Sequence, residues 1–311
     1  MKIAVIGSGG VGGYFGGRLA AAGNEVTFVA RGAHLKAMRG NGLKVLSGLG
    51  DLHLKDVKCT DDTSTIGPVD IVMIAVKLWS TDEAVEAAKP LVEGETAVIS
   101  FQNGIVAKEK VLAAHGPEHT MGGVANIAAL IEEPGVIRHN GTMASLIFAE
   151  LDGKRSKRAE AFYKACVNAQ IKTELVEDIH TRIWEKFVRL VTMSSMTTLC
   201  RMPIGPIRED PDTRALLQQV MTEVITIAKA KGAKLGNDTV KQQMAIVDGY
   251  PPTMVASMCG DLRRGNRLEL PWLAGTVAKL GKELKVPTPA NQFVYAALKL
   301  YTNGRPELVQ I

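Results

Sequence analysis

The chain has 311 residues, which is enough for about two domains and an extensive core. Its formal net charge is only +5 and its basic residues occur singly or in short clusters, so the composition argues against nucleic-acid binding. No stretch approaches the roughly 18 apolar residues of a membrane span, and the first strand-like run leaves no room for a secretory leader, so we expect a cytoplasmic protein without membrane contact.

The first predicted element is a short apolar strand at residues 3–6, of the kind that is buried on both faces of a parallel sheet. Glycines then follow at G-x-G-x-x-G spacing and lead into a helix predicted at residues 11–19. They permit a tight turn, a close approach to a pyrophosphate, and close packing of the helix on the strand. The spacing therefore predicts a dinucleotide-binding loop. Its expected cofactor contacts are Gly7, Ser8, Gly9, Gly10, Val11 and Gly12.

The second predicted strand, residues 26–30, ends in Arg31. In dinucleotide-binding folds the tip of this strand faces the 2′ position of the adenosine ribose, where an acidic residue would bind a 2′-hydroxyl. Arg31 offers a guanidinium to a 2′-phosphate instead, and no Asp or Glu follows it until Asp51. The sequence therefore predicts NADP(H) as the cofactor. A solvated arginine that opens a loop is the alternative.

Two further buried strands are predicted at residues 69–76 and 97–101. Ligands bind beyond the carboxyl ends of such strands. We therefore expect Lys77 near the cofactor phosphates or ribose, and Asn103 near the nicotinamide and the substrate. Either could be an ordinary loop residue. Strand-like runs at residues 145–150 and 171–176 would complete the sheet.

Neither the histidines nor the cysteines form a metal-binding pattern. His115 and His119 are four residues apart, but Gly116 and Pro117 break the helix that would place both on one face, so we interpret them as loop histidines. The cysteines are widely separated and indicate reduced thiols; they are Cys59, Cys166, Cys200 and Cys259. The sequence therefore predicts no metal site.

From about residue 177 strand signals give way to periodic helical segments. The predicted helices are residues 183–199, 212–231, 241–247 and 270–285. We therefore predict an α/β protein in which an NADP-binding, Rossmann-like doubly wound domain (1–176) precedes an all-helical substrate and catalytic domain (177–311). Two such domains imply a cleft with the cofactor on one side and substrate contacts on the other.

Four segments, taken in order, resemble the ketopantoate reductase family (2-dehydropantoate 2-reductases). They are the glycine-rich start with Arg31, SFQNG at 100–104, WEK at 184–186, and SMCGDLRRGNRLE at 257–269 followed by VPTP at 286–289. The resemblance spans nearly the whole chain. It implies NADPH-dependent reduction of a 2-keto acid to a 2-hydroxy acid, which in this family is 2-dehydropantoate to pantoate for pantothenate biosynthesis.

The resemblance also implies roles for individual residues. Lys186 matches the family's catalytic lysine, which assists the carbonyl oxygen as hydride arrives, and Asn103 matches an asparagine at the nicotinamide and substrate end. Ser257 and Glu269 match a serine and a glutamate that hold the substrate and the lysine. The chemistry agrees, because a carbonyl that becomes an alkoxide needs a positive, proton-bearing group.

Two positions depart from the family pattern. The family usually carries asparagines four and eight residues after the lysine, on the same helical face, where this chain has Leu190 and Ser194. If these two line the substrate site, Leu190 leaves a hydroxyl of ketopantoate without a partner. A D-2-hydroxyacid dehydrogenase of the same broad family, acting on a more apolar 2-keto acid, is therefore the alternative.

Other functions stay open. A catalytically silent NADP-binding sensor would not need Lys186 and Glu269, whose presence favours an enzyme. A dehydrogenase of phosphorylated or CoA-linked substrates would use a basic cluster such as Arg263, Arg264 and Arg267, which equally fits a solvated helix face. The expected partners are a small 2-keto acid and, on base rates for soluble enzymes, a second copy of the chain in a homodimer.

Overall fold

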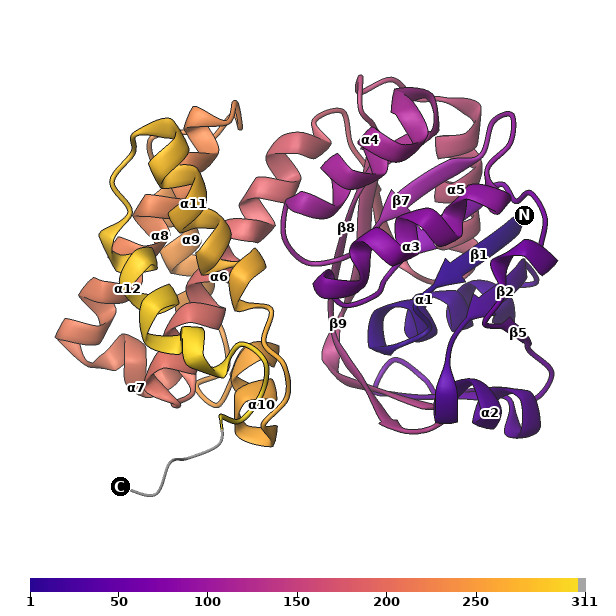
Figure 1. Cartoon of the computed structure of the whole chain (residues 1–311), viewed down its shortest axis with the longest axis horizontal. Helices are drawn as coiled ribbons and strands as arrows, with labels where there is room; N and C mark the ends of the chain where they lie inside the picture. The colour runs from indigo at the N-terminus through magenta and orange to yellow at the C-terminus, as the bar shows by residue number, and fades with distance from the viewer. Residues whose placement is uncertain (307–311) are drawn as a thin grey trace. The chain divides into compact units, whose positions relative to one another are not determined.

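The computed structural model describes residues 1–306 of the protein (Figure 1). The chain divides into two compact units, Met1–Arg182 and Ile183–Ile311. The boundary predicted near residue 176 lies in the connection between the last strand, β10 (Lys172–Leu175), and helix α6 (Ile179–Cys200).

The first unit is built on one sheet, which within residues 1–306 has ten strands. Besides β10, they are β1 (Lys2–Ile6), β2 (Glu25–Val29), β3 (Leu43–Ser47), β4 (Leu52–Leu54), β5 (Lys58–Thr60), β6 (Ile71–Ile74), β7 (Ala97–Ser100), β8 (Thr120–Glu133) and β9 (Val136–Glu150). Their order is β4-β3-β9-β8-β7-β6-β1-β2-β5, and β10 also pairs with β9.

Six neighbouring strands, from β5 to β8 through β2, β1, β6 and β7, run parallel. From β1 the chain continues to β2 on one side, and it returns to β6 on the other. This reversal of strand order between β1 and β6 is the position at which open α/β sheets bind ligands. The predicted doubly wound sheet is confirmed.

Alternating strand residues build a core on each face of the sheet. Ile3 and Val5 pack in a cluster with α1 (Gly10–Ala21), α2 (Gly32–Asn41) and α5 (Lys157–Asn168). Ala4 and Ile6 point to the other face, into a second cluster with α3 (Thr81–Ala88) and α4 (Val106–His119). α3 and α4 pack against each other on this face, with α4 against β7 and β8 and α3 against β1 and β6 (Figure 1). This two-sided burial explains why β1 reads as a continuous apolar run.

Several strands of the sheet were not predicted from the sequence. β8 and β9 form a long antiparallel hairpin, of which only residues 145–150 were predicted. The first six residues of β8 are buried and its last four are exposed. Its apolar residues therefore follow no single periodicity along the strand. β3, β4 and β5 are short and only partly buried, so none of them shows a continuous apolar run in the sequence.

The interpretation of His115 as a loop residue was wrong. It lies in α4, where it is buried and its Nε2 is 3.1 Å from the Val85 carbonyl. The same interpretation was wrong for His119, which is the last residue of α4. Gly116 does interrupt the helix, with φ 76° and ψ 167°. The helix therefore ends its regular part just after His115 rather than before it.

Three further features of the described residues concern thiols, membrane spans and metal sites. All four cysteines are free thiols, and burial raises the pKa of the Cys166 thiol to about 12. Within residues 1–306 no helix combines the length and apolarity needed to cross a membrane. The same residues contain no group of three or more histidine, cysteine, aspartate or glutamate side chains arranged to hold a metal ion.

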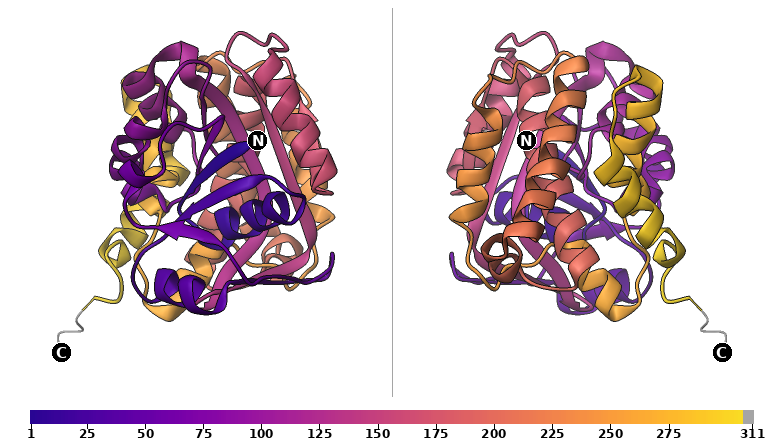
Figure 2. Two further views of the ribbon diagram at one scale, coloured as in Figure 1. Left: turned by 90° about the vertical axis from the view of Figure 1, so that its right-hand side faces the viewer. Right: turned by 90° about the vertical axis from the view of Figure 1, so that its left-hand side faces the viewer.

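The second unit consists of helices, and residues 183–306 contain no strand (Figure 2). After α6 come α7 (Ile204–Glu209), α8 (Pro211–Ala230), α9 (Thr239–Asp248), α10 (Ser257–Arg264), α11 (Ala274–Leu284) and α12 (Pro289–Leu298). The buried Glu223 on α8 accepts the backbone N–H groups of Ala290 and Asn291, at 2.9 and 3.0 Å. Its carboxylate therefore caps the start of α12 and joins the two helices. The predicted all-helical region is confirmed.

Candidate functional site

The glycine-rich loop is held against the ends of β2 and β6. Gly7 has φ +94°, and a Cβ there would lie 2.7 Å from the Val76 nitrogen, so only glycine fits. The backbone N–H groups of Gly7 and Ser8 both donate to the Val29 carbonyl, at 3.1 and 3.2 Å. The buried Ser8 hydroxyl donates to the same oxygen at 3.1 Å. These contacts fix the first half of the loop.

The second half of the loop is closed toward the protein and open at one residue. Added Cβ atoms at Gly10 and Gly12 would collide with the carbonyls of Ala129 and Gly7, whereas one at Gly9 would meet nothing within 4 Å. Gly9 also precedes α1, whose first turn contains no acidic residue. The N–H groups of a helix start on an open side favour an anion, so the loop fits a pyrophosphate.

His34, which the sequence analysis missed, connects this loop to the turn between β8 and β9. Its Nδ1 accepts the Gly135 N–H at 3.0 Å, so its Nε2, 2.8 Å from the Ser8 carbonyl, carries the hydrogen and donates it. Burial lowers the pKa of His34, although the Ser8 carbonyl opposes that effect. Both contacts therefore belong to the neutral imidazole. Its position three residues after Arg31 was the signal available in the sequence.

Arg31 lies two residues after the end of β2 and is the N-cap residue of α2. Its guanidinium forms an ion pair with Glu83 of α3 at 2.7 Å, an acid that sequence spacing did not reveal. Both side chains are more than half exposed, at 61% and 58%. An exposed pair of this kind contributes at most about 1 kcal/mol, so it leaves Arg31 available to a more strongly charged partner.

Lys77 and Asn103 follow the neighbouring strands β6 and β7. Lys77 is exposed, with its ammonium 5.7 Å from the centre of the Trp79 ring. The loops that carry the two residues are joined by the buried Gln102, whose amide nitrogen donates to the Val76 carbonyl at 3.1 Å and to the Thr81 hydroxyl at 2.9 Å. Gln102 was not among the predicted site residues.

In the second unit, Lys186, Leu190 and Ser194 lie four residues apart on α6 and thus share one face. Lys186 and Leu190 are half-buried, and Ser194 is buried. Within residues 1–306 the Ser194 hydroxyl has no hydrogen-bond partner. Among the described residues the buried hydroxyls of Ser195 and Thr198 on α6 also have no partner, so this property alone does not mark Ser194 as a ligand contact.

Burial and two charged neighbours determine the pKa of the Lys186 ammonium. Burial lowers the pKa of Lys186 to about 8, the Glu269 carboxylate opposes this shift, and the Arg189 guanidinium adds to it. Arg189 itself donates to the side-chain oxygen of Gln243 on α9 at 2.9 Å. Lys186 therefore combines the electrostatic influence of a carboxylate with a pKa close to neutral pH, as a proton donor requires.

Glu269 and Ser257 reach this unit's site from two other segments. Glu269 is buried immediately before the short 3₁₀ helix Leu270–Trp272. Ser257 is exposed as the first residue of α10. The backbone N–H of Ala256, just before it, donates to the Thr197 hydroxyl on α6 at 3.3 Å. That contact docks α10 about three turns along α6 from Lys186.

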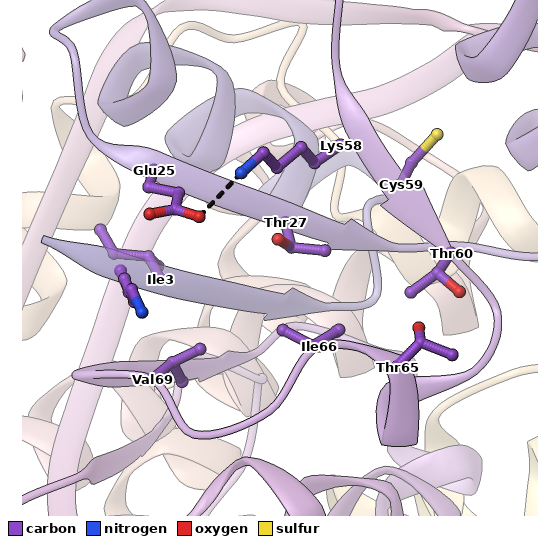
Figure 3. A pocket seen from close by; sticks show the side chains of 10 residues that line it. Ile3, Glu25, Thr27, Lys58, Cys59, Thr60, Thr65, Ile66 and Val69 are labelled. Carbon is purple, nitrogen blue, oxygen red and sulfur yellow. Dashed lines mark hydrogen bonds and ion pairs between the residues drawn. The ribbon is translucent and has the colours of Figure 1, made fainter.

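A cavity of about 380 Å³ lies elsewhere in the first unit, across β1, β2 and β5 (Figure 3). Its wall includes Lys58 and Glu25, which form an ion pair at 2.7 Å. None of the residues predicted to bind cofactor or substrate lines it. The loops at the carboxyl ends of the strands, rather than this cavity, therefore remain the candidate site of the first unit.

Comparison with known families covers most of the chain. Residues 3–153 match the family described as ketopantoate reductase PanE/ApbA, and residues 178–302 match ketopantoate reductase PanE/ApbA C terminal. A 2-dehydropantoate 2-reductase of Mesorhizobium japonicum is 29% identical over 96% of this chain and 97% of its own length. The uncharacterized oxidoreductase YkpB of Bacillus subtilis is also 29% identical, over 97% and 99%.

Solved structures agree with this grouping. The crystal structure of 2-dehydropantoate 2-reductase from Geobacter metallireducens has a TM-score of 0.90 and 29% identity, and covers 97% of this chain and 100% of its own. A ternary structure of D-mandelate dehydrogenase with NADH and anilino(oxo)acetate has a TM-score of 0.87 and 20% identity, with coverage of 97% and 98%. At that identity the second likeness concerns the fold alone.

Proposed function

Because the chain belongs to the ketopantoate reductase family and is an oxidoreductase, we propose that it reduces a 2-keto acid to the 2-hydroxy acid with NADPH. Our first candidate for the substrate is 2-dehydropantoate, which would make pantoate for pantothenate biosynthesis. The observation that carries the proposal is Lys186, with its pKa near 8 and its electrostatic coupling to Glu269. A protein that only bound the cofactor would not need this pair.

The first unit is proposed to hold the cofactor. The open side of Gly9 and the start of α1 would take the pyrophosphate, and Arg31 would take a 2′-phosphate. Lys77 and Asn103 would contact the cofactor from the ends of β6 and β7, with Asn103 toward the nicotinamide. When bound, NADPH supplies the hydride. We expect NADPH rather than NADH because of Arg31. The fold alone does not decide between the two cofactors, since the D-mandelate dehydrogenase neighbour holds NADH.

The second unit is proposed to hold and activate the substrate. Lys186 would donate a hydrogen bond and then a proton to the carbonyl oxygen, because that oxygen gains negative charge as the carbon is reduced. Glu269 keeps the ammonium charged and oriented, while burial and Arg189 make it more acidic. Ser257 and Ser194 would offer hydroxyls to the polar groups of the 2-keto acid.

This role of Lys186 predicts the pH dependence of reduction. The protonated form is the donor, so kcat/KM should be highest below the pKa of about 8 and fall tenfold per pH unit above it. Glu269→Gln removes the group that raises this pKa, so its profile should break at a lower pH. Initial rates of reduction from about pH 6 to about pH 10 measure the pH profiles of the unmutated enzyme and of Glu269→Gln. A flat profile across that range in the unmutated enzyme would assign the proton to another group.

Leu190 should control the choice of substrate. An asparagine there can hydrogen-bond a hydroxyl of ketopantoate, so Leu190→Asn should raise the kcat/KM ratio of ketopantoate to apolar 2-keto acids by about tenfold. Leu190→Met, which keeps an apolar side chain of similar size, is the control and should leave the ratio unchanged. If Leu190→Asn also leaves it unchanged, Leu190 lies outside the substrate site.

The test of the proposed function is NADPH oxidation with ketopantoate and a panel of branched and aromatic 2-keto acids. The highest kcat/KM with ketopantoate supports our assignment. The highest value with an aromatic 2-keto acid would instead identify a D-2-hydroxyacid dehydrogenase, the second candidate, which Leu190 favours. Tight NADPH binding without turnover of any 2-keto acid would contradict both and indicate a sensor.

A further inference from the structure

The orientation of one peptide bond in the glycine-rich loop decides whether the loop can receive an anion. The N–H of Gly9 donates to no protein acceptor within residues 1–306, and the space beside Gly9 is open. The Gly9 carbonyl is already committed, since it accepts the Gly13 N–H at 2.7 Å in the first turn of α1. The N–H is therefore the backbone group of Gly9 that remains for a ligand.

The direction of that N–H follows from the carbonyl of the preceding residue. A trans peptide is planar, so the Ser8 carbonyl and the Gly9 N–H point to opposite sides. The Ser8 carbonyl faces His34, whose Nε2 is 2.8 Å away. Consequently, the contact with His34 turns the Gly9 N–H away from α2.

Without that contact the peptide has a second orientation open to it. Rotation of the peptide plane changes ψ of Ser8 and φ of Gly9, and glycine accepts positive as well as negative φ. Gly9 now has φ −76°. The N–H and hydroxyl of Ser8 are anchored to Val29, but these bonds lie before the rotating plane and do not prevent the rotation.

His34 is itself held in place by a distant part of the chain. Its Nδ1 accepts the N–H of Gly135, which lies 101 residues further along in the turn between β8 and β9. The Gly135 carbonyl in turn accepts the N–H of Lys44 in β3 at 2.9 Å. The imidazole ring is thus fixed at both nitrogens, on a scaffold of two sheet segments.

We propose that His34 is a positioning residue for the dinucleotide: it holds the Ser8 carbonyl and so aims the Gly9 N–H at the cofactor's pyrophosphate. The inference rests on the proposed function in that it requires a dinucleotide at this loop. It assigns Arg31, the N-cap of α2, and His34, on the first turn of α2, to different parts of one ligand. Arg31 would select the 2′-phosphate, and His34 would act on the pyrophosphate, which NADPH and NADH share.

The test compares His34→Leu, His34→Gln and the unmutated protein in fluorescence titrations with NADPH, NADH and ADP. Loss of an aimed N–H should raise all three dissociation constants by a similar factor of about tenfold in His34→Leu. His34→Gln, which can still donate to Ser8, should restore binding to within about threefold. His53→Leu is the control, because His53 is exposed on β4 and its side chain lies 3.1 Å from the Asn41 carbonyl, away from the glycine-rich loop.

Further measurements separate this role from a catalytic or a structural one. Turnover at saturating NADPH should stay within about twofold, because His34 acts on binding and not on the reduction step. Equal thermal midpoints of His34→Leu and His34→Gln with unequal affinities would exclude a merely structural effect. Binding of all three ligands within twofold of the unmutated protein in His34→Leu, or a loss confined to NADPH, would overturn the proposal. Absence of 2-keto acid turnover with intact titrations would contradict the proposed function and leave this inference standing.

Discussion

Lys186→Ala should lower turnover at saturating 2-keto acid by at least about 100-fold, which corresponds to roughly 3 kcal/mol of transition-state stabilisation. The proposed contact of the Lys186 ammonium with the carbonyl oxygen strengthens as negative charge develops there. The substitution should therefore lower kcat and kcat/KM by similar factors. NADPH affinity, measured by fluorescence titration, should stay within about twofold, because Lys186 is proposed to contact the substrate.

A second lysine substitution in the same unit controls for the general effect of removing a positive charge. Lys241 is an exposed lysine on α9 of the same unit, and Lys241→Ala should leave turnover unchanged. Turnover of Lys186→Ala within tenfold of the unmutated enzyme would remove Lys186 from the mechanism. A collapse of NADPH binding would assign it to the cofactor instead.

Arg31→Ala should remove most of the preference for NADPH over NADH, which we expect to be at least tenfold in kcat/KM in the unmutated enzyme. A charge-assisted contact with a phosphate is worth roughly 1.5 to 3 kcal/mol, so KM for NADPH should rise about ten- to 100-fold. KM for NADH should hardly change, because NADH has no 2′-phosphate. The measurement is steady-state kinetics with each cofactor at saturating 2-keto acid.

Two controls separate cofactor binding from the ion pair of Arg31. Arg39→Ala removes another arginine of α2, which pairs with Asp61 and is similarly exposed, and it should preserve the preference. Glu83→Ala removes the partner of Arg31 and should maintain or increase NADPH affinity. If Glu83→Ala instead reproduced the effect of Arg31→Ala, the arginine would act through the ion pair. Equal use of both cofactors by the unmutated enzyme would refute the prediction of NADP specificity.

Much of the architecture was predictable because its signals are local. The strand, glycine turn and helix at residues 2–21 follow from an apolar run and three spaced glycines, all of which act on their near neighbours. The helical unit was predictable from its 3.6-residue periodicity. The common face of Lys186, Leu190 and Ser194 required only the helix itself.

The extent of the sheet was not predictable in the same way. β3, β4 and β5 are only partly buried, so they lack the continuous apolar run that marks the equally short β6 and β7 in the sequence. β8 changes from buried to exposed along its length, so its residues follow no single period. These strands exist because neighbouring strands offer them hydrogen bonds, and the sequence of one strand does not contain its neighbour's register.

The sequence by itself determined the dinucleotide-binding start, the division into a sheet unit and a helical unit, and the residues that resemble a reductase site. Only the tertiary structure decided that His34 joins Ser8 to Gly135, that Glu83 meets Arg31, and that burial brings the pKa of Lys186 to about 8. The physical reason is the distance along the chain over which each interaction acts. Turn and helix signals act over a few residues, whereas a hydrogen bond across 101 residues or the desolvation of an ammonium depends on how the strands and helices pack.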